Sequence, residues 1–381
     1  MTKEQSVELM TDKMAKFVAY VGKKLPDDVE AKLQELLSTL PPFCADFFRG
    51  IEPATSSMTR LSYAYDICMF FDFLTSRHAT GSPSICTEAK PEIRSFGLSA
   101  KDFTIEQFRQ ISVTDLERYL EYLKYRPDDP DHRNTNKEQG IKRKFFSLKS
   151  FFGYFQRTGQ ITVNPTLSMQ VPKIREKEIV RLNQEEIKEL LKEAESGAGL
   201  SPRQKQFHQK TKVRDCALLA LMLGTGIRVS ECVGLNLSDV DIKEQGIHIH
   251  RKGGKEATVY FSDEVAQYLE RYLEERRTLC SIETGTDTQD EPALFLSLRK
   301  KRLTVRSVEY LVKKYASVAT PKKKITPHKL RSSYGSALYA KTNDIYLVAD
   351  ILGHNDVNIT RKFYAAIEEE RRKSVKHIDI V

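Results

Sequence analysis

A nearly continuous apolar stretch in the second half of the chain constrains the fold more than any other feature. Residues 216–223 are all apolar, and the surrounding pattern predicts a helix over residues 213–223 with almost no polar face. Such a helix has to be buried on all sides, so a domain must be built around it. Gly224 and Gly226 follow directly and predict a sharp turn at its end.

Beyond this turn, Arg228 stands just before a short helix predicted at residues 230–233. Held on a buried scaffold, Arg228 is a candidate for rigid phosphate binding, because guanidinium donors match phosphate oxygens. A salt bridge with Glu231 or a plain surface charge explains this arginine equally well. The segment alone leaves both interpretations open.

The chain carries one clear β pattern. Residues 246–250 alternate in polarity, a glycine turn follows, and residues 257–261 return, which predicts a hairpin with Lys252 and Lys255 at its tip. The other patterns are helical. We therefore expect a mainly α fold with a small antiparallel β-sheet in the C-terminal domain.

Metal-ligand patterns are weak. His248 and His250 share one face of the first strand, but no further ligands lie nearby in the sequence, so we favour an exposed polar face. The six cysteines are scattered and are expected to be reduced, mostly buried thiols. We predict no metal and no cofactor.

The length of 381 residues is enough for two domains with an appendage. Residues 1–50 are predicted as a helical extension whose apolar stripe packs on the next domain, or contacts a neighbouring protomer or DNA. Residues 51–172 form a helical domain, residues 173–182 a charged linker and residues 183–381 the second domain. The stripe consists of Val7, Met10, Met14, Phe17 and Val21.

In the first domain we predict helices at residues 57–76, from a capping box of Thr114 and Glu117, and at residues 139–157. The last of these has one apolar and one basic face. Such a basic face is ordinarily solvated, but a helix of this kind also fits a major groove, so we predict DNA contact. The candidates, all placed on the surface, are Lys142, Arg143, Lys144 and Lys149.

In the second domain a capping box of Asn183 and Glu186 predicts a helix to about residue 195, residues 201–212 are expected to be a loop, and residues 263–277 an amphipathic helix. The formal charge of +9 favours a polyanionic partner. Between residues 299 and 331 there are twelve basic residues and one acidic residue, which predicts a phosphate-lined surface. Lys322, Lys323 and Lys324 are the DNA-binding candidates there.

The longest apolar run, residues 216–223, is far shorter than the ~20 residues that cross a bilayer. The first residues also lack the apolar core of a signal peptide. We expect a soluble, cytoplasmic protein without a membrane partner.

Residues that handle phosphate recur near the C-terminus. His328 and Arg331 lie three residues apart, His354 follows Leu-Gly, and Tyr364 comes ten residues later. Arginine binds phosphate oxygens, histidine exchanges a proton near neutral pH, and a tyrosine oxygen can attack phosphorus. Together with Arg228 and Lys252, these residues form an ordered set of six.

This ordered set resembles the tyrosine recombinase (phage integrase) family over nearly all of residues 50–370, and most of all its single-recombinase Xer-type members. The resemblance implies a helical SAM-like core-binding domain at residues 51–172 and a tyrosine-recombinase catalytic domain at residues 183–381. The motifs that carry it are Asn164-Pro165, Gly226-Ile227-Arg228-Val229-Ser230-Glu231, Arg251-Lys252-Gly253-Gly254-Lys255, Thr326-Pro327-His328-Lys329-Leu330-Arg331 and Leu352-Gly353-His354.

The resemblance also implies the roles of the residues. Tyr364 would attack the scissile phosphate and form a 3′-phosphotyrosyl bond, which conserves bond energy and requires neither nucleotide nor metal. Arg228 and Arg331 would clamp the non-bridging oxygens. The catalytic set is completed by Lys252 as general acid, with Lys255 as its rival, His328 in proton transfer and His354 as a hydrogen-bond donor.

Two positions depart from the common Xer pattern. The tyrosine usually stands nine residues after the Leu-Gly-His histidine, which here is Phe363, whereas Tyr364 matches a number of element integrases. Ser332 stands where a histidine often follows the motif arginine, and we expect activity to survive this change.

The implied function is site-specific recombination, with Xer-type chromosome dimer resolution preferred over integration or excision of a phage or conjugative element. The implied partner is double-stranded DNA with an inverted-repeat site, bound by a homotetramer on two duplexes, with a monomer or dimer possible off DNA. A DNA translocase or accessory factor and a nucleoid-associated location fit this function. A type IB topoisomerase-like enzyme and a catalytically dead DNA-binding accessory protein stay open as alternatives.

Overall fold

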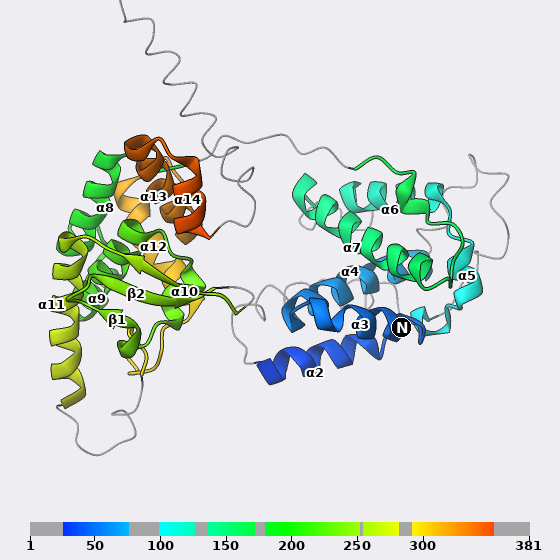
Figure 1. Cartoon of the computed structure of the whole chain (residues 1–381), viewed down its shortest axis with the longest axis horizontal. Helices are drawn as coiled ribbons and strands as arrows, with labels where there is room; N and C mark the ends of the chain where they lie inside the picture. Colours follow the sequence, from blue (N-terminus) through cyan, green and yellow to red (C-terminus); the bar gives the residue numbers. More distant parts are fainter. Residues whose placement is uncertain are drawn as a thin grey trace, which may run out of the picture. The chain divides into compact units, whose positions relative to one another are not determined.

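The structure is a computed structural model that describes residues 26–75, 99–125, 136–171, 180–251, 254–281 and 292–353 (Figure 1). The chain divides into two compact units, Met1–Glu176 and Lys177–Val381. Both are built mainly from helices, and a small antiparallel sheet lies in the second, so the predicted fold class is confirmed. The apolar stripe of residues 7–21 and the residues Lys252, His354 and Tyr364 lie outside the described residues.

The first unit encloses a core rich in phenylalanine. Phe108 stacks on Phe152 with ring centroids 4.6 Å apart, and Phe47, Phe70 and Phe151 are fully buried. The helices predicted at residues 57–76 and 139–157 are both present. The helices are α2 (Pro26–Leu37), α3 (Cys44–Ile51), α4 (Ser57–Thr75), α5 (Ile105–Arg109), α6 (Val113–Tyr125) and α7 (Glu138–Arg157), with 3₁₀ turns at Glu52–Ala54, Ala100–Asp102 and Pro165–Leu167.

Residues 26–51 contribute to this same core. Leu33 of α2 and Phe47 of α3 are buried in one cluster with Leu61 of α4. The α2 helix is also tied to α4 by an ion pair of Glu30 with Arg60 at 3.2 Å. Because these helices share the core, residues 26–51 fold with the first unit.

The predicted cap of α6 is wrong by two residues. Ser112 and Asp115 form the reciprocal pair: the backbone N–H of Ser112 donates to the Asp115 carboxylate at 2.9 Å, and the Asp115 N–H donates to the Ser112 hydroxyl at 3.3 Å. Thr114 and Glu117 have the same sequence spacing, and aspartate in place of glutamate concealed the earlier pair.

The second unit surrounds α9, which contacts α8, α11 and α13 (Figure 1). The predicted hairpin is confirmed, with Ile247 paired to Val259, and a short strand is added to its edge. His248 and His250 are both exposed, as expected of a polar face. The elements are α8 (Gln184–Ser196), α9 (Pro202–Thr225), α10 (Val229–Gly234), β1 (Val240–Asp241), β2 (Gly246–His250), β3 (Glu256–Tyr260), α11 (Asp263–Ser281), α12 (Val305–Ala319), α13 (Pro327–Thr342) and α14 (Ile345–Leu352), with a 3₁₀ turn at Leu237–Asp239.

The α9 helix corrects one prediction and confirms another. Residues 201–212 are not a loop: Ser201 and Gln204 form a capping box, and Pro202 occupies the first turn of the helix. Their polarity reflects a half of the helix that is largely exposed to solvent. Residues 217–222 are buried as predicted, and Leu218 is fully enclosed.

A buried carboxylate joins α9 to α12. Asp215 accepts hydrogen bonds from the hydroxyls of Thr211 at 3.0 Å and Tyr315 at 2.8 Å. It also pairs with Lys314 at 3.0 Å and with Arg214 at 2.6 Å. These partners compensate the buried charge. Asp215 therefore has a structural role in the otherwise apolar part of α9.

Candidate active site

The first predicted catalytic pair lies on α13. Thr326 precedes the helix, Pro327 opens it, and His328 and Arg331 follow within its first turns. Residues three apart share one helix face. The histidine is exposed whereas Arg331 is only 5% exposed, so one face offers an accessible imidazole beside a guanidinium fixed in the interior.

Arg331 is held by two backbone carbonyls. It donates to the oxygen of Gly226 at 2.7 Å, in the turn after α9, and to the oxygen of Leu352, the last residue of α14. Both acceptors end a helix, where carbonyl oxygens lack partners within the helix and carry partial negative charge. The side chain therefore joins the ends of α9 and α14.

Arg228 also contacts the end of α14, but from another element. It stands at the N-cap of α10 and donates to Glu231 at 2.8 Å and to the oxygen of Gly353 at 3.1 Å. The Glu231 carboxylate also accepts the backbone N–H of Arg228 at 2.7 Å. The predicted salt bridge with Glu231 is therefore present, and the contact with Gly353 fixes the guanidinium at the end of α14. Phosphate binding by Arg228 stays a prediction.

Two glycines make this close approach possible. Gly226 has φ of +64°, and a Cβ atom there would lie 2.4 Å from the ring of Tyr334. Gly353 ends α14 with φ of +60°, in the left-handed region that disfavours other residues. A side chain at Gly226 would clash with Tyr334 and press on Leu352 at the end of α14, and one at Gly353 would clash with the guanidinium of Arg251.

The imidazole of His328 is exposed at its surface but partly enclosed by its neighbours. The resulting desolvation, followed by the positive charges of Lys329, Arg331 and Arg228, lowers the pKa of His328 below its ordinary value. An unperturbed histidine titrates near 6.5, so His328 is neutral at pH 7. A neutral imidazole accepts a proton or a hydrogen bond through its bare nitrogen.

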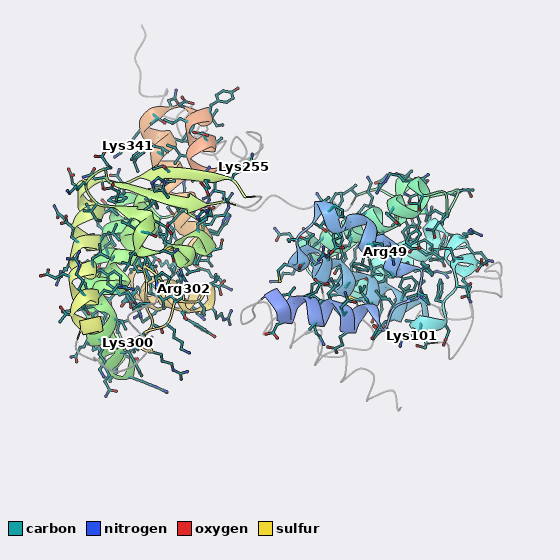
Figure 2. All side chains as sticks on the ribbon, turned by 60° about the horizontal axis from the view of Figure 1, so that its bottom comes forward. Arg49, Lys101, Lys255, Lys300, Arg302 and Lys341 are labelled. Atoms are coloured by element: carbon teal, nitrogen blue, oxygen red, sulfur yellow. The ribbon has the colours of Figure 1, made fainter. Side chains whose placement is uncertain are left out.

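The hairpin carries the two candidates for the general acid, Lys252 and Lys255. The N–H of Arg251 donates to the carbonyl of Lys255 at 2.7 Å, which closes the hairpin beyond its regular strands. Lys255 is exposed at the turn end of the hairpin (Figure 2). Lys252 lies between these two residues in the sequence and outside the described part of the chain.

The predicted basic face of α7 is partly wrong. Lys144 is 3% exposed and lies 3.7 Å from the buried carboxylate of Asp66 on α4. Arg143 is exposed but gives both Nη groups to the same carboxylate, at 2.6 and 2.7 Å. Lys142 and Lys149 are half-buried. An acidic partner on another helix draws Lys144 inward, which spacing along α7 alone does not reveal.

The basic run of residues 299–331 serves two purposes. Lys322 and Lys324 are exposed, whereas Lys323 pairs with Glu186 at 2.7 Å. Arg302 donates to the carbonyls of residues 233–235 and so caps the end of α10. Some of these cations, such as Arg302 and Lys323, therefore hold the fold together. The exposed ones, such as Lys322 and Lys324, are accessible from solvent.

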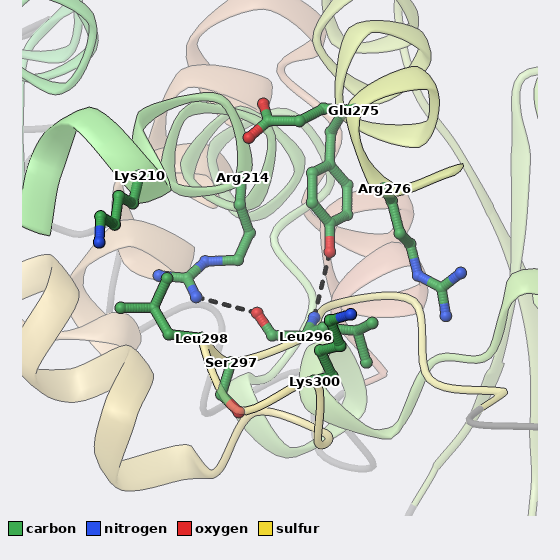
Figure 3. A pocket seen from close by; sticks show the side chains of 9 residues that line it. Lys210, Arg214, Glu275, Arg276, Leu296, Ser297, Leu298 and Lys300 are labelled. Carbon is green, nitrogen blue, oxygen red and sulfur yellow. Dashed lines mark hydrogen bonds between the residues drawn. The ribbon is translucent and has the colours of Figure 1, made fainter. Parts of the chain in front are cut away.

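A pocket of about 260 Å³ lies elsewhere in this unit, between α9, α11 and the loop at residues 296–300 (Figure 3). Arg214 donates there to the carbonyl of Leu296, and the N–H of Leu296 donates to the Tyr272 hydroxyl. The predicted catalytic residues that the structure describes, Arg228, His328 and Arg331, do not line it. Among the described residues, no cluster of three potential metal ligands occurs, and no helix is long and apolar enough to cross a membrane.

Two guanidinium groups from different elements donate to the end of α14, and His328 shares a helix face with one of them. This set of side chains suits the binding of a phosphodiester. The profile of the phage integrase family matches residues 180–371, and the chain belongs to this family. It is a tyrosine recombinase, a site-specific DNA recombinase.

Relatives match over most of their length. Tyrosine recombinase XerC of Caldanaerobacter subterraneus subsp. tengcongensis is 31% identical, over 88% of this chain and 86% of the relative. Tyrosine recombinase XerS of Streptococcus uberis is 28% identical, over 90% and 97%. The fold resembles the XerH recombinase in a post-cleavage complex with a palindromic difH substrate, with a TM-score of 0.60, 19% identity and coverage of 85% and 81%.

The Glu231→Gln variant tests how Arg228 is held. The exchange preserves size but removes the charge and one acceptor oxygen, so we expect a loss of about 1–3 kcal/mol, seen as a lower melting temperature. Glu309→Gln is the matched control, because Glu309 forms an exposed ion pair with Arg306 at the same spacing. Equal melting temperatures for the two variants would contradict the buried clamp.

Proposed function

We propose that the chain is an Xer-type recombinase that resolves chromosome dimers by acting at an inverted-repeat site. The observation that carries the proposal is the convergence of Arg228 and Arg331 on the two residues that precede His354. The XerC and XerS relatives support the Xer assignment, because the matches cover 86% and 97% of their length.

In the proposed cleavage step, the Tyr364 oxygen attacks the scissile phosphorus while the bond to the 5′-oxygen breaks. Lys252 protonates the leaving 5′-oxygen, and neutral His328 assists removal of the tyrosine proton. Arg228 and Arg331 stabilise the charge on the non-bridging oxygens, each by about 3–4 kcal/mol if well placed. The freed 5′-hydroxyl of the partner duplex then attacks the phosphotyrosine, which reseals DNA and releases Tyr364.

The proposed assembly is a homotetramer on two duplexes. Each protomer supplies one nucleophile, and exchange of two duplexes breaks four strands in all. We infer that four copies act together on DNA, that a monomer or dimer exists off DNA, and that the enzyme works on the nucleoid in the cytoplasm, with a translocase or accessory factor as regulator. Exposed lysines such as Lys322 and Lys324 are the proposed backbone contacts, since such contacts dominate affinity.

Integration or excision of a mobile element is the second candidate. The position of Tyr364, ten residues after His354, favours it, because that spacing resembles a number of element integrases. The two candidates share the chemistry and differ in the site that is used.

Covalent capture tests the nucleophile. The full chain is mixed with sheared genomic DNA, and denaturation-resistant protein–DNA complexes are sequenced to identify the site. A nicked duplex carrying that site should trap a covalent adduct with the wild-type chain and none with Tyr364→Phe, since the phenol oxygen is lost. Binding without an adduct in the wild type would contradict catalysis, and an undiminished adduct in Tyr364→Phe would contradict the assignment.

The captured site also decides the biological role. Exchange between two plasmid-borne copies supports a recombinase, whereas nicking and rejoining without exchange supports the topoisomerase-like alternative. A single chromosomal site with inverted repeats supports dimer resolution. Sites at the ends of a mobile element would overturn it in favour of integration.

The pH dependence tests His328. Because its pKa is lowered, the imidazole stays neutral as pH falls to about 6.5, and protonation removes the acceptor only below that value. We expect single-turnover cleavage to lose rate on an acid limb centred below about pH 6.5. His328→Gln should be slower and should flatten this limb. An unchanged acid limb in His328→Gln would assign the titration to another group.

A further inference from the structure

Arg251 links two elements that are separated by a hundred residues of chain. It directly follows β2, and its N–H closes the hairpin on Lys255 at 2.7 Å. Its guanidinium crosses to the end of α14, where Nη1 donates to the oxygen of Asp350 at 3.1 Å and Nη2 to the oxygen of Ile351 at 2.7 Å. The hairpin is thereby fastened to α14.

The contact is close as well as polar. A Cβ atom at Gly353 would lie 2.4 Å from Nη1 of Arg251 and 2.8 Å from its Cζ, so the guanidinium packs directly on the turn that ends α14. The Nε group is buried without a partner among the described residues.

The sequence places two proposed catalytic residues beside this link. Lys252 follows Arg251, and His354 follows Gly353. We propose that Arg251 is a positioning residue. It fixes the end of the hairpin against α14, and so it sets the position of the Lys252 backbone relative to Arg228 and Arg331. This inference rests on the proposed role of Lys252 as general acid.

The leaving group provides a readout that a merely structural role would not change. Sulfur in place of the bridging 5′-oxygen leaves as a thiolate, since thiols have a pKa near 8.5, and needs no proton from an acid. A variant that misplaces the acid therefore loses rate on the oxygen substrate and recovers it on the sulfur substrate. The probe is the captured duplex with oxygen or sulfur at the scissile position.

The experiment compares single-turnover cleavage by the full-length wild type, Arg251→Ala, Arg251→Lys and Lys252→Ala. We expect Arg251→Ala to be about 10²-fold slower on the oxygen substrate, a loss typical of a misplaced group. On the sulfur substrate we expect a loss below about 5-fold, as for Lys252→Ala, because no acid is then required. Arg251→Lys should fall between, since an ammonium cannot fork to two carbonyls.

Arg276→Ala is the matched control, because Arg276 is a buried arginine of the same unit that donates to the carbonyl of Ala293 at 3.0 Å. Its sulfur-to-oxygen rate ratio should equal that of the wild type. Equal losses on both substrates in Arg251→Ala, or no loss on either, would overturn the proposal. If Lys252→Ala itself shows no sulfur rescue, the proposed acid is wrong, and a wild-type chain that forms no adduct refutes the proposed function instead.

Discussion

The C-terminal end of α14 is the point on which the second unit depends. Its last carbonyls and the following glycine, residues 350–353, accept hydrogen bonds from Arg251, Arg331 and Arg228. The Asp350 oxygen also accepts the backbone N–H of Gly353 at 2.8 Å. Carbonyls at a helix end lack the i+4 donor that those in the middle of the helix have, and they carry the negative end of its dipole. Guanidinium groups satisfy both needs, and each comes from a different element, so one helix end fastens the hairpin, α10 and α13 together.

The same interactions prepare the site electrostatically. Three guanidinium groups close together repel one another, and the buried Glu231 carboxylate and the helix-end carbonyls offset part of that repulsion. Desolvation, followed by the positive charges of Lys329, Arg331 and Arg228, lowers the pKa of His328. The positive charge that remains is suited to a phosphate. Because the arginines are held in the absence of DNA, the transition-state stabilisation that we propose for them would need little reorganisation.

Local sequence rules predicted the parts whose causes are local. The buried α9 helix, the hairpin and the Asn183 capping box follow from periodicity, turn residues and side-chain spacing. The prediction that Lys144 lies on the surface was wrong because its partner, Asp66, lies on another helix, and no pattern along α7 contains that information. The polar half of α9 was missed because a solvent-exposed helix segment and a loop have similar composition.

The site was predictable as a set of residue types but not as a set of contacts. The order of Arg228, His328 and Arg331 indicated phosphate chemistry, and the resemblance supplied their roles. The role of Arg251 had no local signal, because its acceptors lie about a hundred residues away in the chain. Contacts between residues so far apart in the chain depend on how the helix ends pack in three dimensions, which cannot be read from a single sequence.

We propose that Arg331 and Arg228 stabilise charge on the scissile phosphate in addition to fastening α14. Cleavage of a duplex with an uncharged methylphosphonate at the scissile position separates these two roles, because the negative charge on the phosphate is then absent. We predict that Arg331→Ala slows cleavage of the ordinary phosphodiester by about 10²–10³-fold and slows cleavage of the methylphosphonate by less than about 10-fold. Equal losses on both substrates would contradict the claim, because Arg331 would then serve only to hold the fold.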